Sequence, residues 1–198
     1  MILGLTGGFG CGKSSVLAFF KASGWHTLSA DSVCHDLYNH RDADVMSAIR
    51  EHWGNDMFES DGSLDKSAVS KIVFSDNSEL KWLCSVLYPK VEKTAKEFFK
   101  LHEKENIIFE VPLLYEAGWD TMFDKIIAVY ASLEVQHQRL LKTGFSLDNI
   151  IQRSQLQMFP ELKMEKADYA IINNGNINDL EKQCKELINT FKESNKNG

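Results

Sequence analysis

The fold is decided by residues 1–15, MILGLTGGFGCGKSS. A short apolar run, Met1–Leu5, leads into residues 7–14, which match G-x-x-x-x-G-K-[ST], the consensus of a phosphate-binding loop. Glycines let such a loop turn tightly, so that backbone N–H groups approach phosphate oxygens that a Cβ atom would obstruct. The amphipathic run 16–22 predicts a helix whose positive dipole end favours the same anion. A chance glycine-rich turn is the alternative, but the strand before the loop and the helix after it favour a phosphate site.

Two side chains of this loop supply chemistry beyond backbone contacts. Lys13 can reach the β- and γ-phosphates of a nucleotide, and the Ser14 hydroxyl can ligate Mg²⁺. The sequence therefore predicts an α/β protein that handles nucleotide phosphates.

The composition limits the partners of the chain. Its 198 residues are enough for one domain with a sizeable core, or for a core with one insertion. A formal net charge of −6 argues against a general nucleic-acid-binding surface, so phosphate affinity has to be local. The apolar runs are far shorter than a bilayer span, and residues 1–15 lack the basic segment and cleavage site of a signal peptide. We expect a cytoplasmic protein that binds neither nucleic acid nor membrane.

Two acidic residues lie near the ends of expected strands, where parallel α/β sheets place their chemistry. Asp31 follows the β-leaning run 25–29. It is either catalytic or the N-cap of the helix expected at 32–38, and the pattern leaves both roles open. Glu110 is the next-to-last residue of the buried run 107–111. It resembles the acid on the second acidic strand of phosphate-loop enzymes, which holds Mg²⁺ directly or through water.

Residues 42–105, between these two strands, have a helical pattern. Apolar residues recur at intervals of four over Val45–Trp53, and Gly54 then breaks the helix. Pro89 is predicted to open a further helix. A helical block between two strands of an α/β core indicates an inserted substrate domain.

The remaining sequence returns to the core. Runs 125–130 and 167–172 are predicted strands, and 180–191 is predicted as a final amphipathic helix that covers the sheet. Residues 193–198 are polar and are expected to fray.

A helical hairpin is predicted between these last two strands, with a break at Gly144. Its first helix, about 133–142, carries Arg139. Its second helical run carries Arg153 and Lys163. Cations on a mobile hairpin suit a lid that stabilises charge on a transferring phosphoryl group. A hairpin whose charges are merely solvated is the alternative.

Several motifs together resemble one family, the dephospho-CoA kinases, over nearly the whole length. The stretches that carry the resemblance are GLTGGFGCGKSS, SADSVCHDLY, WGNDMFESDGSLDKSAVSKIVF, VPLLYEAG, residues 157–163 and ADYAIINNG. Very many enzymes share the phosphate loop, whereas D-G-S-L-D-[KR]…I-V-F and P-L-L-[FY]-E are much more particular.

The resemblance implies a three-layer α/β fold of the P-loop NTPase type, with a parallel sheet, a helical insertion and a helical lid. The implied core comprises 1–31, 106–132 and 165–192, the substrate-binding insertion 32–105, and the lid 133–164. The implied reaction transfers the γ-phosphoryl group of ATP to the ribose 3′-hydroxyl of dephospho-CoA. It gives CoA and ADP, the last step of coenzyme A biosynthesis, with Mg²⁺ as cofactor. The resemblance leaves a monomer or a weak homo-oligomer as the expected state.

Site residues follow position by position from this resemblance. The implied catalytic residues are Lys13, Asp31, Arg139 and Arg153. The implied ATP-binding residues are Gly8, Gly10, Cys11, Gly12, Lys13, Ser14, Ser15, Asn173 and Gly175. The implied substrate-binding residues are Asp31, His35, Leu113, Leu114 and Tyr115, and core packing is the alternative for at least one of the last three. The implied metal ligands are Ser14, Asp31 and Glu110, with the role of Asp31 open between base, positioner and ligand.

The sequence departs from the family pattern at a few positions. Cys11 replaces a common serine, but the loop works through its backbone. Lys66 replaces a frequent arginine, which keeps the charge and loses bidentate geometry. The hairpin is about one residue shorter near Lys142–Gly144, so contacts around that turn transfer least well.

Two other functions remain to be weighed. A phosphate-loop kinase acting on a nucleoside or nucleoside monophosphate is disfavoured by the insertion motifs. A GTPase-like switch usually takes its guanine specificity from N-K-x-D, and no such segment occurs in the sequence.

Overall fold

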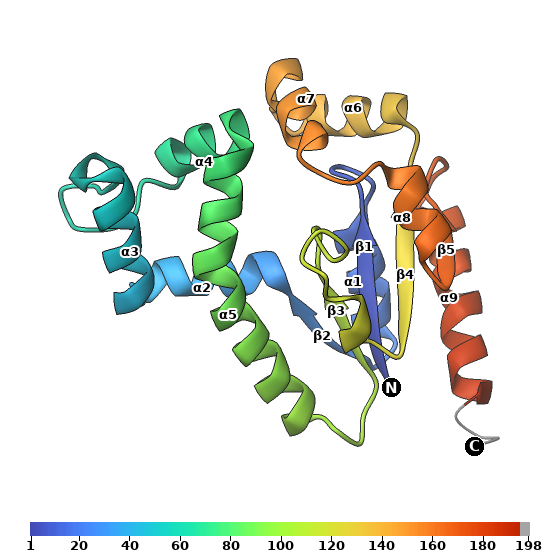
Figure 1. The fold of residues 1–198 in the computed structure, drawn as a ribbon. Helices are drawn as coiled ribbons and strands as arrows, with labels where there is room; N and C mark the ends of the chain where they lie inside the picture. The colour runs from blue at the N-terminus through green and yellow to red at the C-terminus, as the bar shows by residue number, and fades with distance from the viewer. Residues whose placement is uncertain (195–198) are drawn as a thin grey trace. The chain divides into compact units, whose positions relative to one another are not determined.

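The computed structural model describes residues 1–194 and divides into two compact units. One unit comprises Met1–Leu28 and the chain from Leu101 onward, and the other comprises Ser29–Lys100 (Figure 1). We call them the sheet unit and the helical unit and describe each by itself.

A five-stranded sheet with the order β2-β3-β1-β4-β5 forms the centre of the sheet unit. Its strands are β1 (Ile2–Gly7), β2 (His26–Ser29), β3 (Ile107–Glu110), β4 (Lys125–Tyr130) and β5 (Tyr169–Ile172). β1 pairs in parallel with β3 and β4, and β4 pairs in parallel with β5. All of β3 and nearly all of β1 is buried, as expected for parallel strands covered on both faces.

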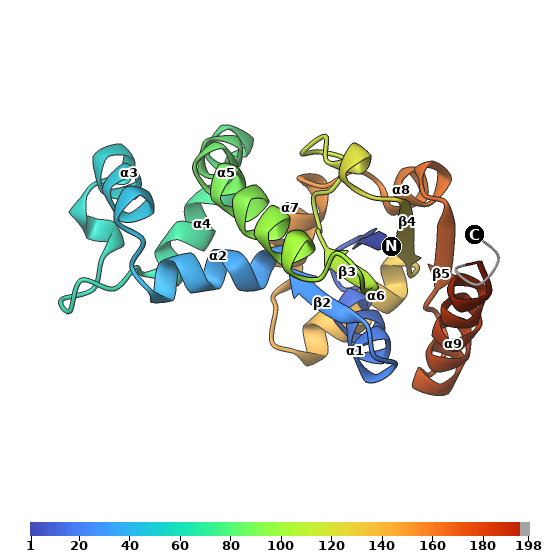
Figure 2. The same cartoon turned by 90° about the horizontal axis from the view of Figure 1, so that it is seen from below.

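Helices cover both faces of this sheet, which gives three layers. Figure 2 shows α1 (Lys13–Ala22) and α9 (Ile177–Ser194) on one side and α8 (Pro160–Lys166) on the other. The core between the sheet, α1 and α9 includes Leu5 and Phe20, both fully buried. The unit also contains α6 (Leu133–Lys142), α7 (Leu147–Gln155) and the 3-10 turn η2 (Asp120–Met122). The predicted parallel α/β fold is confirmed.

The helical unit has its own core. It contains α2 (Ala30–Asn39), α3 (Ala43–Trp53), η1 (Asn55–Met57), α4 (Lys66–Ser75) and α5 (Asn77–Leu101). Apolar side chains of α3, α4 and α5, among them Ile49, Val69 and Leu87, are buried against one another. As predicted, α3 ends before Gly54, which has a φ of 87°.

The prediction that Pro89 opens a helix was wrong, because α5 runs through it. Leu83 and Leu87 before the proline and Val91 and Ala95 after it are all buried at intervals of four. Proline removes one backbone hydrogen bond and favours a kink. The continuous apolar stripe outweighs that cost, since most helix stability in proteins comes from tertiary packing.

Two further expectations changed at the carboxyl-terminal end. The second helical run of the hairpin is two helices, α7 and α8, and Pro160 occupies the first turn of α8. α9 extends to Ser194, so residues 193–194 of the expected tail are helical, and residues 195–198 lie outside the described part of the chain. Within residues 1–194, no helix is long and apolar enough to span a bilayer.

Candidate functional site

The phosphate loop connects the end of β1 to the start of α1, as the sequence predicts. Gly10 and Gly12 have φ angles of 79° and 96°. A Cβ atom on Gly12 would lie 2.3 Å from Nδ2 of Asn173, which donates a 2.8 Å hydrogen bond to the Cys11 carbonyl. Both the backbone conformation and the close approach of Asn173 therefore require glycine at position 12. Cys11 contributes its backbone, and burial raises the pKa of its thiol.

Gly12→Ala is expected to lower the free energy of unfolding by about 2–5 kcal/mol and to weaken ATP binding at least tenfold. Left-handed strain costs about 1–2 kcal/mol, and displacing the buried Asn173 amide costs about 1–3 kcal/mol more. Gly24→Ala is the matched control, because Gly24 has a φ of 89° but nothing within 4 Å of its Cβ position. Denaturant unfolding and ATP titration of both variants test this. Equal losses in the two variants would contradict a special role for Asn173.

Lys13 lies at the start of α1 and folds back over the loop. Its Nζ donates hydrogen bonds to the carbonyls of Gly7 at 3.1 Å and Gly8 at 3.0 Å. An ammonium group has three donors, so one remains for a phosphate oxygen. Ser14 is exposed at the second position of the helix, and Ser15 is half-buried one residue later. The loop thus presents an ammonium, a hydroxyl and a helix N-terminus together.

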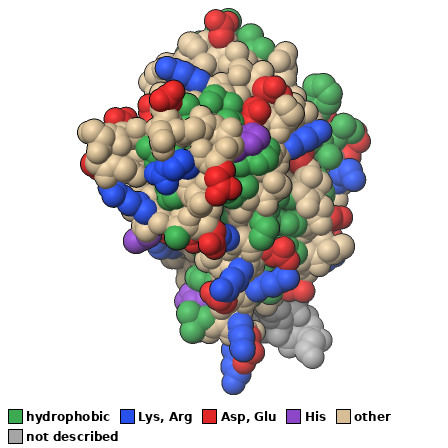
Figure 3. Space-filling model, turned by 60° about the vertical axis from the view of Figure 1, so that its left-hand side comes forward, with side chains coloured by type: hydrophobic (Ala, Val, Ile, Leu, Met, Phe, Trp, Pro, Cys, Tyr) green, Lys and Arg blue, Asp and Glu red, His purple; other side chains and the backbone are tan. Residues whose placement is uncertain are grey.

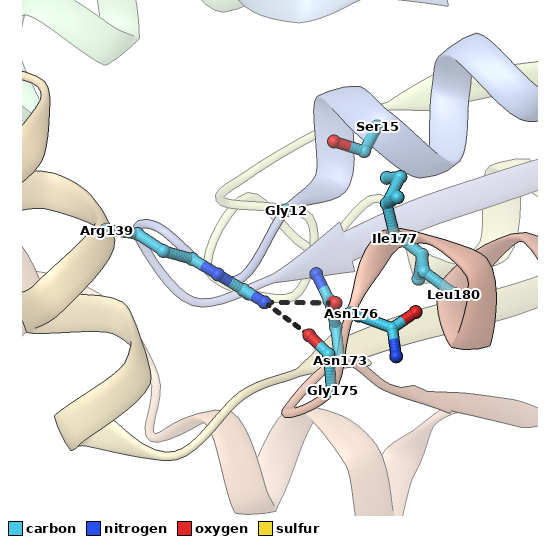
Figure 4. Close-up of a pocket in the computed structure, with 8 residues that line it drawn as sticks. All are labelled: Gly12, Ser15, Arg139, Asn173, Gly175, Asn176, Ile177 and Leu180. Atoms are coloured by element: carbon cyan, nitrogen blue, oxygen red, sulfur yellow. Dashed lines mark hydrogen bonds between the residues drawn. The ribbon is translucent and has the colours of Figure 1, made fainter.

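A pocket of about 190 Å³ opens beside this loop. It is lined by Gly12, Ser15, Arg139, Asn173, Gly175, Asn176, Ile177 and Leu180 (Figure 4). The lining comes from the loop and α1, from α6, from the turn between β5 and α9, and from the start of α9. Apolar side chains and amide groups share the wall, a combination that suits a flat polar heterocycle.

Arg139 extends from α6 to this pocket. Its Nη2 donates to Oδ1 of Asn173 at 3.2 Å and to the carbonyl of Gly175 at 3.5 Å (Figure 4). Its Nη1 is buried without a partner among the described residues. A buried guanidinium nitrogen without an acceptor is costly, so a ligand oxygen or nitrogen at this position would be bound favourably. The predicted site residues Arg139, Asn173 and Gly175 are therefore brought together.

Arg153 lies on α7 against the tip of the loop. Its guanidinium carbon is 5.3 Å from the ring centroid of Phe9 and 5.1 Å from that of Phe145. The two rings meet edge to face at 5.2 Å. These contacts connect the second helix of the hairpin to the phosphate loop.

Lys163 was expected to be one of the lid cations, with a solvated charge as the alternative, but its side chain is buried inside the sheet unit. It is fully buried on α8, 2.9 Å from Oε1 of Glu116, and it donates to the carbonyl of Pro112. Burial lowers the pKa of its ammonium, and the Glu116 carboxylate opposes that effect. The sequence offered one signal of this difference, Pro160, which separates Lys163 from the helix that carries Arg153.

The two acids lie in different units. Glu110 ends β3 with 6% of its surface exposed, beside Leu5 of β1 in the parallel register. Asp31 is the exposed second residue of α2 in the helical unit, and His35 is exposed one turn later. Ser29 occupies the N-cap position, so the alternative that Asp31 caps this helix was wrong.

The three predicted substrate contacts at 113–115 differ in exposure. Leu114 is fully buried, so core packing is its role in this structure, which corrects the prediction of a substrate contact. Leu113 and Tyr115 are partly exposed. Burial raises the pKa of Tyr115 to about 12, and its hydroxyl has no hydrogen-bond partner among residues 1–194. These two remain candidates for contact with an acceptor.

A sequence model of the dephospho-CoA kinase family matches residues 1–179. The chain belongs to the dephospho-CoA kinase family. The dephospho-CoA kinase of Aquifex aeolicus is 35% identical over 189 residues, which cover 93% of this chain and 94% of the relative. That of Fusobacterium nucleatum is also 35% identical, over 96% of this chain and 98% of the relative.

Solved structures resemble the chain over the same length. The crystal structure of TT1252 from Thermus thermophilus has a TM-score of 0.79 at 29% identity and covers 96% of this chain and 97% of its own. The dephospho-CoA kinase from Campylobacter jejuni has a TM-score of 0.71 at 23% identity, with 98% of each chain covered, which supports the fold. The predicted resemblance to dephospho-CoA kinases is confirmed.

Proposed function

We propose that this chain transfers the γ-phosphoryl group of ATP to the ribose 3′-hydroxyl of dephospho-CoA, giving CoA and ADP. The observation that carries the proposal is a complete phosphate loop beside a pocket of about 190 Å³, in a member of the dephospho-CoA kinase family. Phosphoryl transfer of this kind needs in-line positioning, charge neutralisation and exclusion of water, more than covalent chemistry by the protein.

The donor half of the reaction belongs to the sheet unit. The backbone of Gly8–Ser15 wraps the ATP phosphates, and Lys13 contacts the β- and γ-phosphates. The adenine occupies the pocket beside Asn173 and Gly175, where the unpartnered Nη1 of Arg139 supplies a donor. In this arrangement Arg139 serves nucleotide binding as well as charge neutralisation.

Asp31 is the residue proposed to act on the acceptor, and it is also a candidate metal ligand. Its carboxylate orients the ribose 3′-hydroxyl and accepts its proton as the new O–P bond forms. A loose transition state develops little charge on the attacking oxygen, so this proton moves late. His35, Leu113 and Tyr115 are the proposed contacts to the remainder of dephospho-CoA.

Mg²⁺ is the proposed cofactor, and the residues beside the loop fit it. Ser14 offers a hydroxyl oxygen and Glu110 a carboxylate oxygen, the hard donors that Mg²⁺ prefers. Glu110 is nearly buried and lies near the Cys11 thiol, where it raises the thiol pKa as a minor contribution. When bound, the ion neutralises charge on the β- and γ-phosphates.

The activity is tested by ADP release with a panel of acceptors. ADP formation is expected with dephospho-CoA and Mg-ATP, and only background formation with nucleosides or nucleoside monophosphates. Turnover with a nucleoside monophosphate and none with dephospho-CoA would support the rival kinase. Tight GTP binding without transfer to any acceptor would support a regulatory switch.

Arg153→Ala is expected to lower kcat by about 10²–10³-fold with little change in the KM for ATP, because a lid cation stabilises charge that develops in the transition state. Steady-state kinetics at saturating dephospho-CoA measure both constants. Phe145→Leu separates charge from packing, since it removes a ring contact of Arg153 but keeps the cation. Near-normal turnover of Arg153→Ala, or an equal loss in Phe145→Leu, would contradict this role.

The proposed setting is the cytoplasm, with the chain as a monomer or weak homo-oligomer. Figure 3 shows acidic and basic side chains interspersed over the face it presents, which supports a small-molecule substrate rather than nucleic acid as the partner. Sedimentation at several protein concentrations tests the oligomeric state.

A further inference from the structure

We propose that His26, His102 and Glu105 form a binding site for a divalent transition-metal ion, Zn²⁺ by the chemistry of the donors. These residues, which we call the edge cluster, all belong to the sheet unit. His26 begins the edge strand β2, and the other two lie between α5 and β3. The proposed function uses none of the three.

The edge cluster lies away from the phosphate site. The loop follows the carboxyl end of β1, whereas Glu105 comes just before the amino end of β3. Because β1 and β3 are parallel neighbours, these two positions are at opposite ends of the sheet. An ion here would be separate from the Mg²⁺ proposed beside the loop.

Three potential ligand atoms converge in this cluster. All three atoms lie within 4.8 Å of one another. His102 Nδ1 is 3.4 Å from Glu105 Oε2, and His26 Nε2 contacts the same oxygen. An ion held tetrahedrally at about 2.0–2.2 Å from each donor keeps its ligands about 3.4 Å apart. The His102 and Glu105 ligand atoms therefore already have the spacing that Zn²⁺ requires, and His26 Nε2 would have to move away from the Glu105 oxygen to take its place around the ion.

Backbone hydrogen bonds fix the two segments that carry these side chains. The His26 amide donates a 2.9 Å hydrogen bond to the Asn106 carbonyl, which joins β2 to the segment before β3. The Glu105 amide donates to the His102 carbonyl at 2.9 Å, which closes the turn that carries both ligands. The imidazole rings of His26 and His102 are stacked, with centroids 3.8 Å apart. A site that is largely formed before binding loses less entropy when the ion enters.

The donor set favours a transition metal over Mg²⁺. Two imidazoles and one carboxylate are the ligands of known three-residue zinc sites, and imidazole is a poor ligand for Mg²⁺. A metal ion accepts both rings as neutral ligands, through one nitrogen of each. The Glu105 side chain is 50% exposed and that of His102 19%, so water can fill the fourth position.

The position of the cluster gives a bound ion a structural consequence. The chain leaves the sheet unit after Leu28 and returns at Leu101. His26 is two residues before the first crossing, and His102 is one residue after the second. A metal ion would therefore cross-link, within the sheet unit, the two segments that lead to and from the helical unit, and would stabilise the folded chain by binding it selectively.

The test is a titration of chelator-treated full chain with Zn²⁺ in the absence of ATP, in competition with a chromophoric chelator. One equivalent of Zn²⁺ is expected to bind and to raise the Tm of the protein. The same result is expected when Mg²⁺ is present in excess. His26→Gln and His102→Gln should each weaken binding by more than the ~10- to 100-fold that loss of an outer-shell partner causes. His40→Gln is the matched control, because His40 is exposed in the helical unit outside the cluster.

Two results would overturn the proposal. One is the absence of saturable Zn²⁺ binding by the unaltered protein. The other is wild-type affinity in both cluster variants, which would place the ion elsewhere. Circular dichroism establishes that each variant is folded, and Glu105→Gln replaces any histidine variant that is not. Visible absorption of the Co²⁺-loaded protein reports whether the ion is four-coordinate.

Discussion

Replacement of Lys13 by methionine is expected to lower kcat with dephospho-CoA on the order of 10³-fold while the fold is kept. The Lys13 ammonium is held at the loop by the carbonyls of Gly7 and Gly8, so its charge is in place before ATP binds. Preorganised charge aimed at a transferring group accelerates the reaction because no reorganisation is needed at the moment of reaction. Methionine keeps the length and apolar stem of the side chain but supplies no cation. Steady-state ADP release and far-UV circular dichroism measure the two effects.

Lys21→Met is the matched control for this experiment. Lys21 lies on the same helix, exposed in its last turn, away from the loop. It is expected to retain wild-type kcat. Lys13→Met also loses two hydrogen bonds, so a fall of about 1–3 kcal/mol in unfolding free energy is compatible with the prediction. Global unfolding of Lys13→Met, or an equal kinetic loss in Lys21→Met, would contradict it.

The core was predictable from the sequence because its signals are local. The run Met1–Leu5, the glycines after it and the helix at Lys13 specify a strand, a loop and a helix within the first 22 residues, and the structure has all three. The acid at Glu110 also lies on its predicted strand. Pro89 shows the limit of local reasoning, since a proline that usually opens a helix lies inside one held by packing on both sides.

The site was only partly predictable, because its contacts join distant segments. Asn173 and Cys11 are 162 residues apart and share a hydrogen bond, which no periodicity could reveal. Arg139 was expected as a lid cation, but its bonds to Asn173 and Gly175 place it in the wall of the pocket beside the phosphate loop. Lys163 was grouped with the lid, whereas the break before α8 lets it turn inward to Glu116.

Asp31→Asn is expected to lower kcat by about 10²-fold or more and to leave the dissociation constant of ATP within about twofold of wild type. Asparagine keeps the shape and can still contact a hydroxyl, but it accepts no proton at neutral pH. Asp31 is exposed on the first turn of α2, so the substitution costs little stability. Steady-state kinetics with dephospho-CoA and direct ATP titration measure the two quantities.

The comparison with Asp36→Asn decides whether the position of the carboxylate matters. Asp36 is exposed on the same helix, and five residues along a helix correspond to about 140° of rotation, so it faces another direction. A helix-dipole or net-charge effect would appear in both variants, whereas action on the acceptor hydroxyl would appear only at Asp31. Loss of Mg-ATP affinity in Asp31→Asn would instead make Asp31 a metal ligand. In that case another group would have to accept the proton of the 3′-hydroxyl. His35 lies one turn away on α2, so it is the side chain to replace next.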